Sequence, residues 1–153
     1  MVKFYKKSYR GSRDKYSIEQ TSINANVAAG QTTSVPIVPP IAEQGVRKVK
    51  HLTCSFQSPT TTDGCWWALV YVPAGTTPGG INLTTGQPLY EPNQYVMNCG
   101  VMDFTAGPTR VSTRISRNLH SGDSIYLLLF PVGSSTSPAL AFSGIVRYAV
   151  CFN

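Results

Sequence analysis

The sequence predicts an all-β protein: a single-domain, eight-stranded jelly-roll sandwich with a disordered basic N-terminal arm. Most apolar segments alternate with a period of two, and no segment has a helical period. Charged residues make up only 13% of the 153 residues, while Thr, Ser, Gly and Pro are abundant. The connections have uneven lengths, which favours a jelly roll because its chain crosses repeatedly between two sheets. We therefore assign residues 1–15 to the arm and residues 16–153 to one jelly-roll domain.

The first 15 residues hold most of the net charge. Six of the 13 Lys and Arg residues lie there against one acidic residue, Asp14, which gives +5 (6 − 1) of the chain's net +6. The rest of the chain is nearly neutral, with seven basic and six acidic residues. A short segment with one sign of charge is easily solvated and typically contacts an anionic partner. The six basic residues are Lys3, Lys6, Lys7, Arg10, Arg13 and Lys15.

Aromatic residues are interleaved with these basic residues at Phe4, Tyr5 and Tyr9. Lys and Arg neutralise phosphates, and aromatic rings stack on unpaired bases, so this combination favours single-stranded nucleic acid. The alternatives are a solubilising tail or a nuclear import signal at Lys6 and Lys7.

The first part of the domain predicts two half-buried strands with an extended segment between them. Residues 23–27 alternate apolar and polar side chains, as a half-buried strand does. Residues 35–41 contain three prolines, so they are expected to form an edge strand or an extended connection. Residues 52–57 alternate again and predict a strand, and residues 58–64 predict a polar loop.

The middle of the chain predicts a central strand and a long loop. Residues 66–72 (WWALVYV) are apolar on both faces, so they are expected to run through the core. Residues 73–93 contain four prolines and four glycines and predict a long ordered loop, which in a compact domain usually has a function. Residues 96–102 predict a further strand.

Three more strands complete the predicted domain. Residues 111–115 alternate Val, Thr and Ile with polar side chains, and residues 125–130 are continuously apolar. A Gly- and Ser-rich loop, residues 131–138, leads to a long C-terminal strand, residues 140–152, whose apolar residues share one parity. Within that strand, Gly144 is expected to mark a bulge.

The motifs of common enzymes are missing, and we expect no catalytic activity. The chain has no G-x-S-x-G, no P-loop and no G-x-G-x-x-G. His120, Ser121 and Asp123 lie within four residues, which is typical of a turn in which Asp123 binds nearby amides, whereas a catalytic triad converges from separate elements. Four separated cysteines and two histidines predict reduced thiols, no metal site and no cofactor.

Two basic groups lie within the domain. Arg47, Lys48 and Lys50 precede a predicted strand, and Arg110 and Arg114 share one face of another. If both strands face the side of the arm, these residues extend a positive surface for nucleic acid. Ordinary surface charge or salt bridges between subunits explain them equally well.

Trp66 and Trp67 predict two different environments, since neighbours in a strand point to opposite faces of the sheet. One side chain fills the core, and the other packs elsewhere in the subunit or anchors a contact between subunits. Trp67 and Tyr71 share a strand face, which leaves a sugar-binding platform as an alternative.

Three segments carry a resemblance to a known family. They are the strand Trp67–Pro73, the loop and strand Leu89–Val96, and the longer segment Arg114–Tyr126. The second and third contain the patterns Y-E-P-x-x-x-V and R-x-x-R-x-L-x-x-G-D-x-I. In these segments, which span roughly the middle half of the chain, the sequence resembles the capsid proteins of small circular single-stranded DNA viruses that encode their own replication initiator, the circovirus-like group.

The resemblance implies a jelly-roll subunit that assembles with itself, in about sixty copies, into a T=1 icosahedral shell. It implies that the arm lies inside on a single-stranded DNA genome, that the protein belongs to the virion and is assembled in the host nucleus or cytoplasm, and that a host receptor is a further partner. The arm departs from the family's usual long arginine-rich arm, because it is short and mixes Lys with Arg. The loops at residues 73–93 and 131–139 are expected to lie at subunit contacts or on the outer surface. Further subunit contacts are expected at Trp66, Trp67, Tyr90, Pro92 and Tyr95.

Two other functions fit the same residues: a monomeric single-stranded nucleic-acid-binding β-barrel module, and a sugar-binding β-sandwich. The first requires aromatic residues that stack on bases from one strand face. No apolar stretch approaches the ~18 to 20 residues of a membrane helix, so no membrane insertion is expected. The charged N-terminus has no apolar segment behind it, which predicts no secretory signal.

Overall fold

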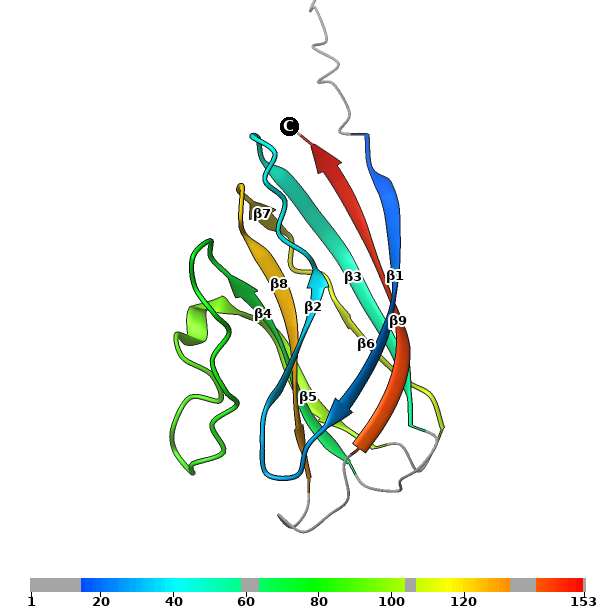
Figure 1. Cartoon of the computed structure of the whole chain (residues 1–153), viewed down its shortest axis with the longest axis vertical. Helices are drawn as coiled ribbons and strands as arrows, with labels where there is room; N and C mark the ends of the chain where they lie inside the picture. Colours follow the sequence, from blue (N-terminus) through cyan, green and yellow to red (C-terminus); the bar gives the residue numbers. More distant parts are fainter. Residues whose placement is uncertain (1–14, 59–63, 104–106, 133–139, 153) are drawn as a thin grey trace, which may run out of the picture.

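The structure is a computed structural model that describes residues 15–58, 64–103, 107–132 and 140–152 (Figure 1). The predicted disordered arm therefore lies outside the described residues, except for Lys15. Sheet A contains, in spatial order, β1 (Ser17–Val27), β9 (Leu140–Phe152), β3 (Arg47–Gln57) and β6 (Thr109–Thr113), with β7 (Arg117–Leu119) also paired to β3. Sheet B contains β2 (Thr33–Val38), β8 (Ser124–Pro131), β4 (Cys65–Val72) and β5 (Val96–Met102), and the 3-10 helix η1 (Asn93–Tyr95) precedes β5.

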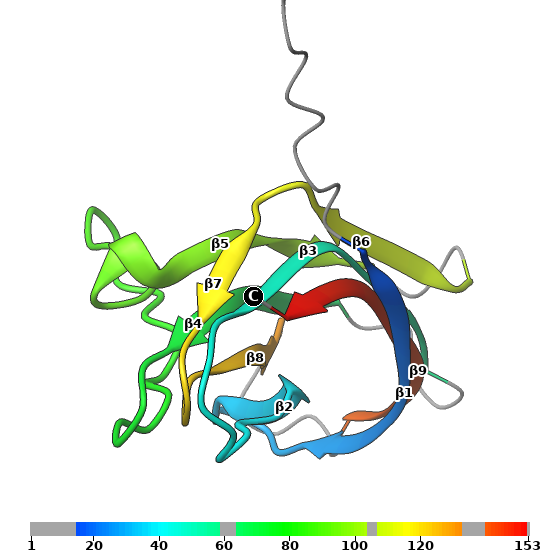
Figure 2. The ribbon, with the colours of Figure 1, turned by 90° about the horizontal axis from the view of Figure 1, so that it is seen from above.

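The strand order is that of a jelly roll, as the sequence predicted. The chain crosses between the sheets from β1 to β2, to β3 and to β4, and it crosses again after β5, after β7 and after β8. β6 and β7 pair with successive parts of β3 and so share one strand position, which gives eight positions among the described strands. Figure 2 shows the two sheets facing each other around the core, with β1 and β2 side by side at one edge.

The core between the sheets explains both kinds of strand pattern in the sequence. In β3, Leu52, Cys54 and Phe56 are buried while the residues between them are not, as expected for a strand with one covered face. β8 is covered on both faces: Leu127 packs in the main core, and Leu128 packs in a second apolar cluster on the other side of sheet B. The prediction of alternating and continuously apolar strands is confirmed.

The second cluster exists because the long loop predicted at residues 73–93 folds over the outer face of sheet B. Ile81 and Tyr90 from the loop are buried with Leu128 of β8. The backbone N–H of Ile81 donates a hydrogen bond of 2.9 Å to the hydroxyl of Thr32, which holds the loop against the start of β2. The loop thus covers apolar side chains that a single sheet would leave in water.

The irregularity predicted at Gly144 lies elsewhere. Gly144 stays in regular register with both neighbouring strands, and glycine is needed there because a Cβ atom would collide with the carbonyl oxygen of Ser55. The register of the β3–β9 pair shifts instead between Lys50 and Thr53. His51, between them, has a φ of 55°, a left-handed conformation that accommodates the bulge.

The start of β1 and the end of β9 lie side by side at one end of sheet A (Figure 1). Ser17 is opposite Val150 in the antiparallel pair. β1 begins six residues earlier than the predicted strand at residue 23, because Ser17–Ser22 pair with β9 through the backbone although their side chains are exposed. Period-two burial cannot reveal such a strand segment, since neither of its faces is covered.

Candidate nucleic-acid and subunit-contact surfaces

The outer face of sheet B is apolar, and the 73–93 loop leaves one row of it partly uncovered. Val101 of β5 is opposite Trp66 of β4, and Trp66 is opposite Phe130 of β8. Trp66 and Phe130 are half-buried, and Val101 is 53% exposed. These three side chains form a continuous strip across three strands, which we call the Val101 row. An apolar strip next to a sheet edge is a candidate contact with another subunit.

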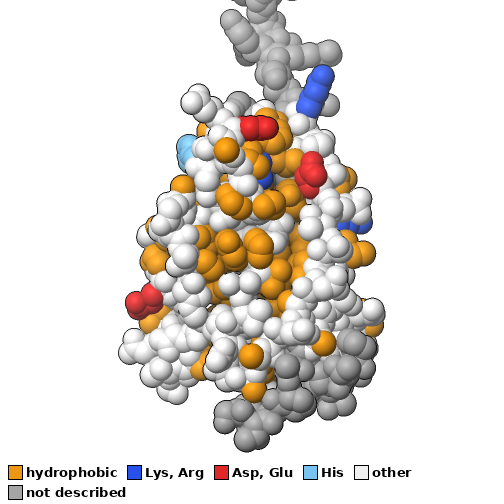
Figure 3. Space-filling view, in the orientation of Figure 1, with side chains coloured by type: hydrophobic (Ala, Val, Ile, Leu, Met, Phe, Trp, Pro, Cys, Tyr) orange, Lys and Arg blue, Asp and Glu red, His pale blue; other side chains and the backbone are white. Residues whose placement is uncertain are grey.

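A second apolar area lies on the side of the sandwich where the edge strands β1 and β2 are neighbours. Figure 3 shows apolar side chains along the middle of this side, with charged side chains mostly at its margins. Ala25 of β1 and Val35 of β2 are half-buried and pack against the core. Unpaired strand edges with few charges pair readily with other chains, so this side is a further candidate contact.

The five residues predicted to form subunit contacts have different environments. Trp67 and Tyr90 are only 6% and 4% exposed and pack inside the subunit, which corrects the expectation for both. Trp66 and Tyr95 are half-buried and Pro92 is exposed, so for these three the contact stays a prediction. Trp66 and Trp67 do point to opposite faces of sheet B, into the second cluster and the main core.

The predicted turn at residues 120–123 is present, and the Asp123 carboxylate holds it together. This carboxylate accepts hydrogen bonds from the backbone N–H groups of His120 (2.8 Å) and Ala74 (2.9 Å) and from the hydroxyl of Tyr71 (2.8 Å). Burial alone would raise the pKa of Asp123, but these hydrogen bonds and the nearby His120 side chain lower it below the ordinary value. Asp123 thus ties the turn to the end of β4.

The arrangement removes the platform on which a sugar-binding function would depend. Trp67 is in the main core, and the Tyr71 hydroxyl is bound to Asp123. Burial, together with the Asp123 carboxylate, raises the pKa of Tyr71 to about 12. The two rings therefore do not form the open pair that stacking on a sugar requires.

The outer face of sheet A has the opposite character: it is polar and basic. Thr53 and Ser55 project outward from β3, because the residues between and beside them point into the core. Ser55 is opposite Arg110 of β6, and Thr53 is opposite Arg147 of β9. The two arginines therefore lie on the strands that flank β3, each about 4.8 Å from it.

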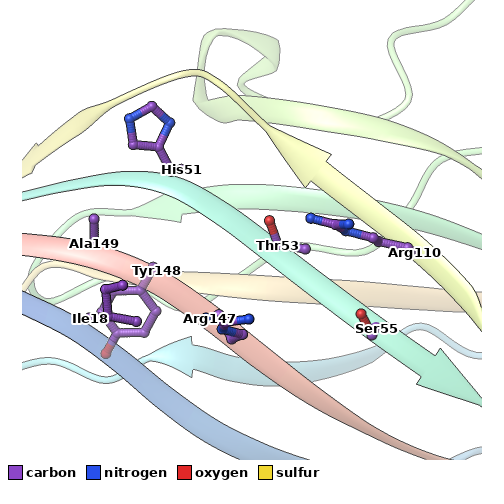
Figure 4. Close-up of a pocket in the computed structure, with 8 residues that line it drawn as sticks. All are labelled: Ile18, His51, Thr53, Ser55, Arg110, Arg147, Tyr148 and Ala149. Carbon is purple, nitrogen blue, oxygen red and sulfur yellow. The ribbon is translucent and has the colours of Figure 1, made fainter.

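A shallow depression of about 460 Å³ lies between these arginines (Figure 4). Arg110 enters it from β6 and Arg147 from β9, while the hydroxyl groups of Thr53 and Ser55 lie on β3 between them. Among the residues that the structure describes, no acidic residue lines the depression. Both arginines are exposed, and in the described part of the chain neither guanidinium group makes a hydrogen bond or an ion pair. Because an arginine is always charged, the depression is a site of uncompensated positive charge.

Four other basic residues predicted to bind nucleic acid are described, and for all of them that contact stays a prediction. Lys50 lies on β3 with its Nζ 3.7 Å from the centroid of the Tyr16 ring. Lys48 lines a separate depression, Arg114 is exposed between β6 and β7, and Lys15 is exposed before β1. The remaining five lie outside the described residues: Lys3, Lys6, Lys7, Arg10 and Arg13.

Arg47 is different, and the expectation that it belongs to a basic surface is wrong. Its side chain is 6% exposed, and its guanidinium donates hydrogen bonds to the carbonyl oxygens of Pro39 (2.8 Å) and Asp123 (3.4 Å). Burial lowers the pKa of Arg47, and the nearby side chains of Tyr148, Asp123 and Glu43 oppose this in part. Arg47 therefore joins two connections of the fold and does not face a ligand.

The residue that sequence reasoning missed on the basic face is Arg147. A signal was present, because Arg147 lies between the buried Val146 and Tyr148 in an alternating strand and so must point outward. What the sequence lacks is the spatial order of the strands. Only the placement of β9 beside β3 brings Arg147 to the same depression as Arg110.

Nothing in the described residues forms a metal-binding group of three or more His, Cys, Asp or Glu side chains. Burial raises the pKa of the Cys54 and Cys65 thiols to about 12, so both are protonated at neutral pH. Over the same part of the chain, no helix has the length and apolar character that crossing a membrane requires.

No protein-family model matches the chain, and no curated protein matches it. The solved structures that are similar in fold include the following three. A chain of Desmodium yellow mottle tymovirus is 14% identical, with 99% of this chain and 95% of that chain covered and a TM-score of 0.47. A chain of infectious bursal disease virus, Gx strain, is 11% identical, with 90% and 32% covered and a TM-score of 0.42. A chain of the disulfide-linked pili of Bacillus endospore appendages is 14% identical, with 90% of each chain covered and a TM-score of 0.36.

Proposed function

We propose that this protein is a viral capsid subunit, which assembles with copies of itself and encloses single-stranded DNA. The observation that carries the proposal is the division of the subunit surface. Sheet A presents a basic, hydroxyl-rich outer face that extends to Ile18 near the start of β1, whereas sheet B and the β1–β2 side present apolar surface. A jelly roll with one surface for nucleic acid and others for its own copies meets the needs of a container subunit.

The finer assignment follows the sequence resemblance: a circovirus-like shell of T=1 geometry with about sixty copies. Sixty arms with six basic side chains each carry about 360 positive charges, whereas a genome carries one negative charge per nucleotide. For a genome longer than about a thousand nucleotides, the arms alone neutralise a minority of the phosphates. The basic residues on sheet A offer additional positive charge for the same purpose.

The direct test is the state of the purified full-length protein with single-stranded DNA present. We expect closed particles of uniform size by negative-stain electron microscopy and by sizing chromatography. A protein that remains a single subunit at every concentration and salt condition tried would refute the container function.

Deleting residues 2–15 is expected to leave folding and shell formation intact. The nucleic-acid content of the particles is expected to fall by at least half, because the deletion removes six of the 13 basic residues from each subunit. The measurement is the ratio of phosphorus to protein in purified particles. A full-length control, in which the same six residues are replaced by glutamine, separates the effect of charge from the effect of length. Normal nucleic-acid content in either variant would contradict the role of the arm.

Val101→Glu is expected to lower the yield of particles at least tenfold while the melting temperature of the subunit stays within a few degrees. Val101 is 53% exposed, so a charge there costs little in the isolated subunit. The same charge is buried without a partner if the Val101 row packs against another subunit. The matched control is Ile115→Glu, which changes an exposed apolar residue between β6 and β7, outside the predicted contacts. Equal losses for both substitutions, or none for Val101→Glu, would exclude the Val101 row as an interface.

A single-strand-binding module is the second candidate, and the basic depression on sheet A favours it. Such a module binds nucleic acid through the same face without forming a shell. The particle measurement separates the two functions, because only the capsid subunit self-assembles.

A further inference from the structure

We propose that the outer face of sheet A carries a phosphodiester-binding site for single-stranded nucleic acid that acts without the arm. The site is the depression between Arg110 and Arg147, with Thr53 and Ser55 on its floor (Figure 4). The inference rests on the proposed function only for the kind of nucleic acid that is bound, which is single-stranded DNA. Binding at this site itself requires no shell.

The charge of the site is the first argument. Arg110 and Arg147 are exposed on two different strands, and neither is paired within the described residues. None of the acidic side chains in the described ranges lines the depression. Two cations that the protein itself does not neutralise attract a polyanion, and binding releases the counterions condensed on its phosphates.

The geometry of the donors is the second argument. Because β3 separates the two arginines, their backbones are about 10 Å apart across the sheet. A single strand of nucleic acid that lies along β3 therefore passes between their guanidinium groups. A guanidinium binds two phosphate oxygens through parallel N–H donors. The hydroxyl groups of Thr53 and Ser55 supply further donors from below, as is usual in phosphate contacts.

Exposed apolar side chains next to the cations favour a single strand over a duplex. Ile18, which lines the depression, is 63% exposed, and Ile145, opposite Ser55, is 52% exposed. Unpaired bases have apolar faces that such side chains can cover, whereas a duplex keeps its bases stacked inside.

The position of the site relative to the arm supports the same ligand. Ala149 is opposite both Ile18 of β1 and Lys50 of β3, so Lys50 lies in the row next to Arg147 on the side toward the start of β1. The Lys50 ammonium lies over the ring of Tyr16, the residue that precedes β1. Lys50 thus lies between the depression and the start of β1, and it adds a third positive charge on the side from which the arm leads.

The test measures binding of a fluorescent oligothymidine to full-length protein at nanomolar concentration, where mass action disfavours shells. Fluorescence anisotropy is recorded at several salt concentrations for the wild type and for the Arg110→Gln/Arg147→Gln variant. The control variant, Thr85→Glu/Gln87→Glu, lowers the net charge by the same two units at exposed positions of the 73–93 loop, which covers sheet B. Melting temperatures are measured for every variant.

We expect the Arg110→Gln/Arg147→Gln variant to bind about 15-fold more weakly at 0.15 M salt and to show a salt slope that is shallower by about 1.4, since each phosphate contact to a single strand contributes about 0.7 to the slope. The control variant is expected to lose less than about threefold. Equal losses in the two variants would mean diffuse attraction and would overturn the site, as would the absence of any loss at Arg110 and Arg147.

An Arg110→Lys/Arg147→Lys variant distinguishes the loss of phosphate contacts from a disturbance of the sheet. If these residues contact phosphates, binding by this variant depends on salt concentration as steeply as binding by the wild type, because the charges remain. A loss as large as that of the glutamine variant would overturn the proposal. Unlabelled oligothymidine is expected to displace the probe at least tenfold more effectively than heparin of equal charge, and equal displacement would exclude a nucleic-acid site.

Failure of this inference and failure of the capsid function give different results. Particles that form while the depression variants bind normally would leave the capsid function standing and remove the site. Binding that depends on Arg110 and Arg147 in a protein that never assembles would do the reverse.

Discussion

Asp123→Ala is expected to lower the free energy of unfolding by about 3 kcal/mol, because it removes a buried acceptor that three donors share. These donors are the backbone N–H groups of His120 and Ala74 and the hydroxyl of Tyr71, all within 2.9 Å of the carboxylate. Asp123 itself is 4% exposed, so water cannot take its place without opening the turn. The measurement is the urea midpoint of the purified subunit.

Asp123 is also expected to make the stability of the folded protein depend on pH. The hydrogen bonds outweigh burial and lower the pKa of Asp123 in the folded protein, so its charged form stabilises the fold at pH values above the ordinary carboxyl pKa of about 3.9. That contribution is lost as the pH falls through the lowered value in the folded state. Asp123→Asn does not titrate and is therefore expected to show less loss of stability below about pH 4 than the wild type does.

The control for this comparison is Glu91→Gln, which changes an exposed carboxylate in the long loop. It is expected to retain the acid response of the wild type. An Asp123→Asn variant with the same dependence of urea midpoint on pH as the wild type would show that the carboxylate charge does not stabilise the turn.

Gly144→Val is expected to cost about 3 kcal/mol or more and to yield mostly insoluble protein. A Cβ atom at this position would collide with the carbonyl oxygen of Ser55 and lie 2.5 Å from Cδ1 of Phe56. Both obstacles belong to β3, the strand next to β9 in sheet A, and Phe56 is a fully buried core residue. Relief therefore requires that β9 move away from β3, which breaks backbone hydrogen bonds between them.

The matched control is Gly79→Ala in the long loop. There the nearest atom to a new Cβ is Cε2 of Tyr90 at 3.4 Å, an ordinary contact, and we expect a change within about 0.5 kcal/mol. The measurement is the soluble yield and thermal unfolding of both variants. Soluble Gly144→Val protein with a wild-type melting temperature would show that β9 and β3 separate more easily than the packing of Phe56 indicates.

The fold was largely predictable from the sequence because burial follows local periodicity. Residues 52–57 and 142–150 alternate, and β3 and β9 bury the expected face there. At the end of β9 the prediction is wrong, because Phe152 is 60% exposed and Cys151 is buried. Residues 66–72 are apolar on both sides, and β4 packs in two clusters. The start of β1 was missed, since Ser17–Ser22 have no buried side chain and pair only through the backbone.

The candidate site was predictable only in part, because a surface depends on which strands become neighbours. The sequence places Arg47 and Lys48 together, yet their side chains point to opposite faces of β3, so Arg47 is buried while Lys48 is not. Arg110 and Arg147 are 37 residues apart and meet only through the order of strands in sheet A. The glycine at position 144 is explained by a close approach between strands, which no local pattern contains.

The neighbouring positions of the start of β1 and the end of β9 have a practical consequence. A polypeptide fused after Phe152 leaves the domain beside the segment that leads to the arm. If the arm faces the interior of a particle, an enzyme or a reporter peptide attached at that end becomes encapsulated cargo without any added targeting sequence.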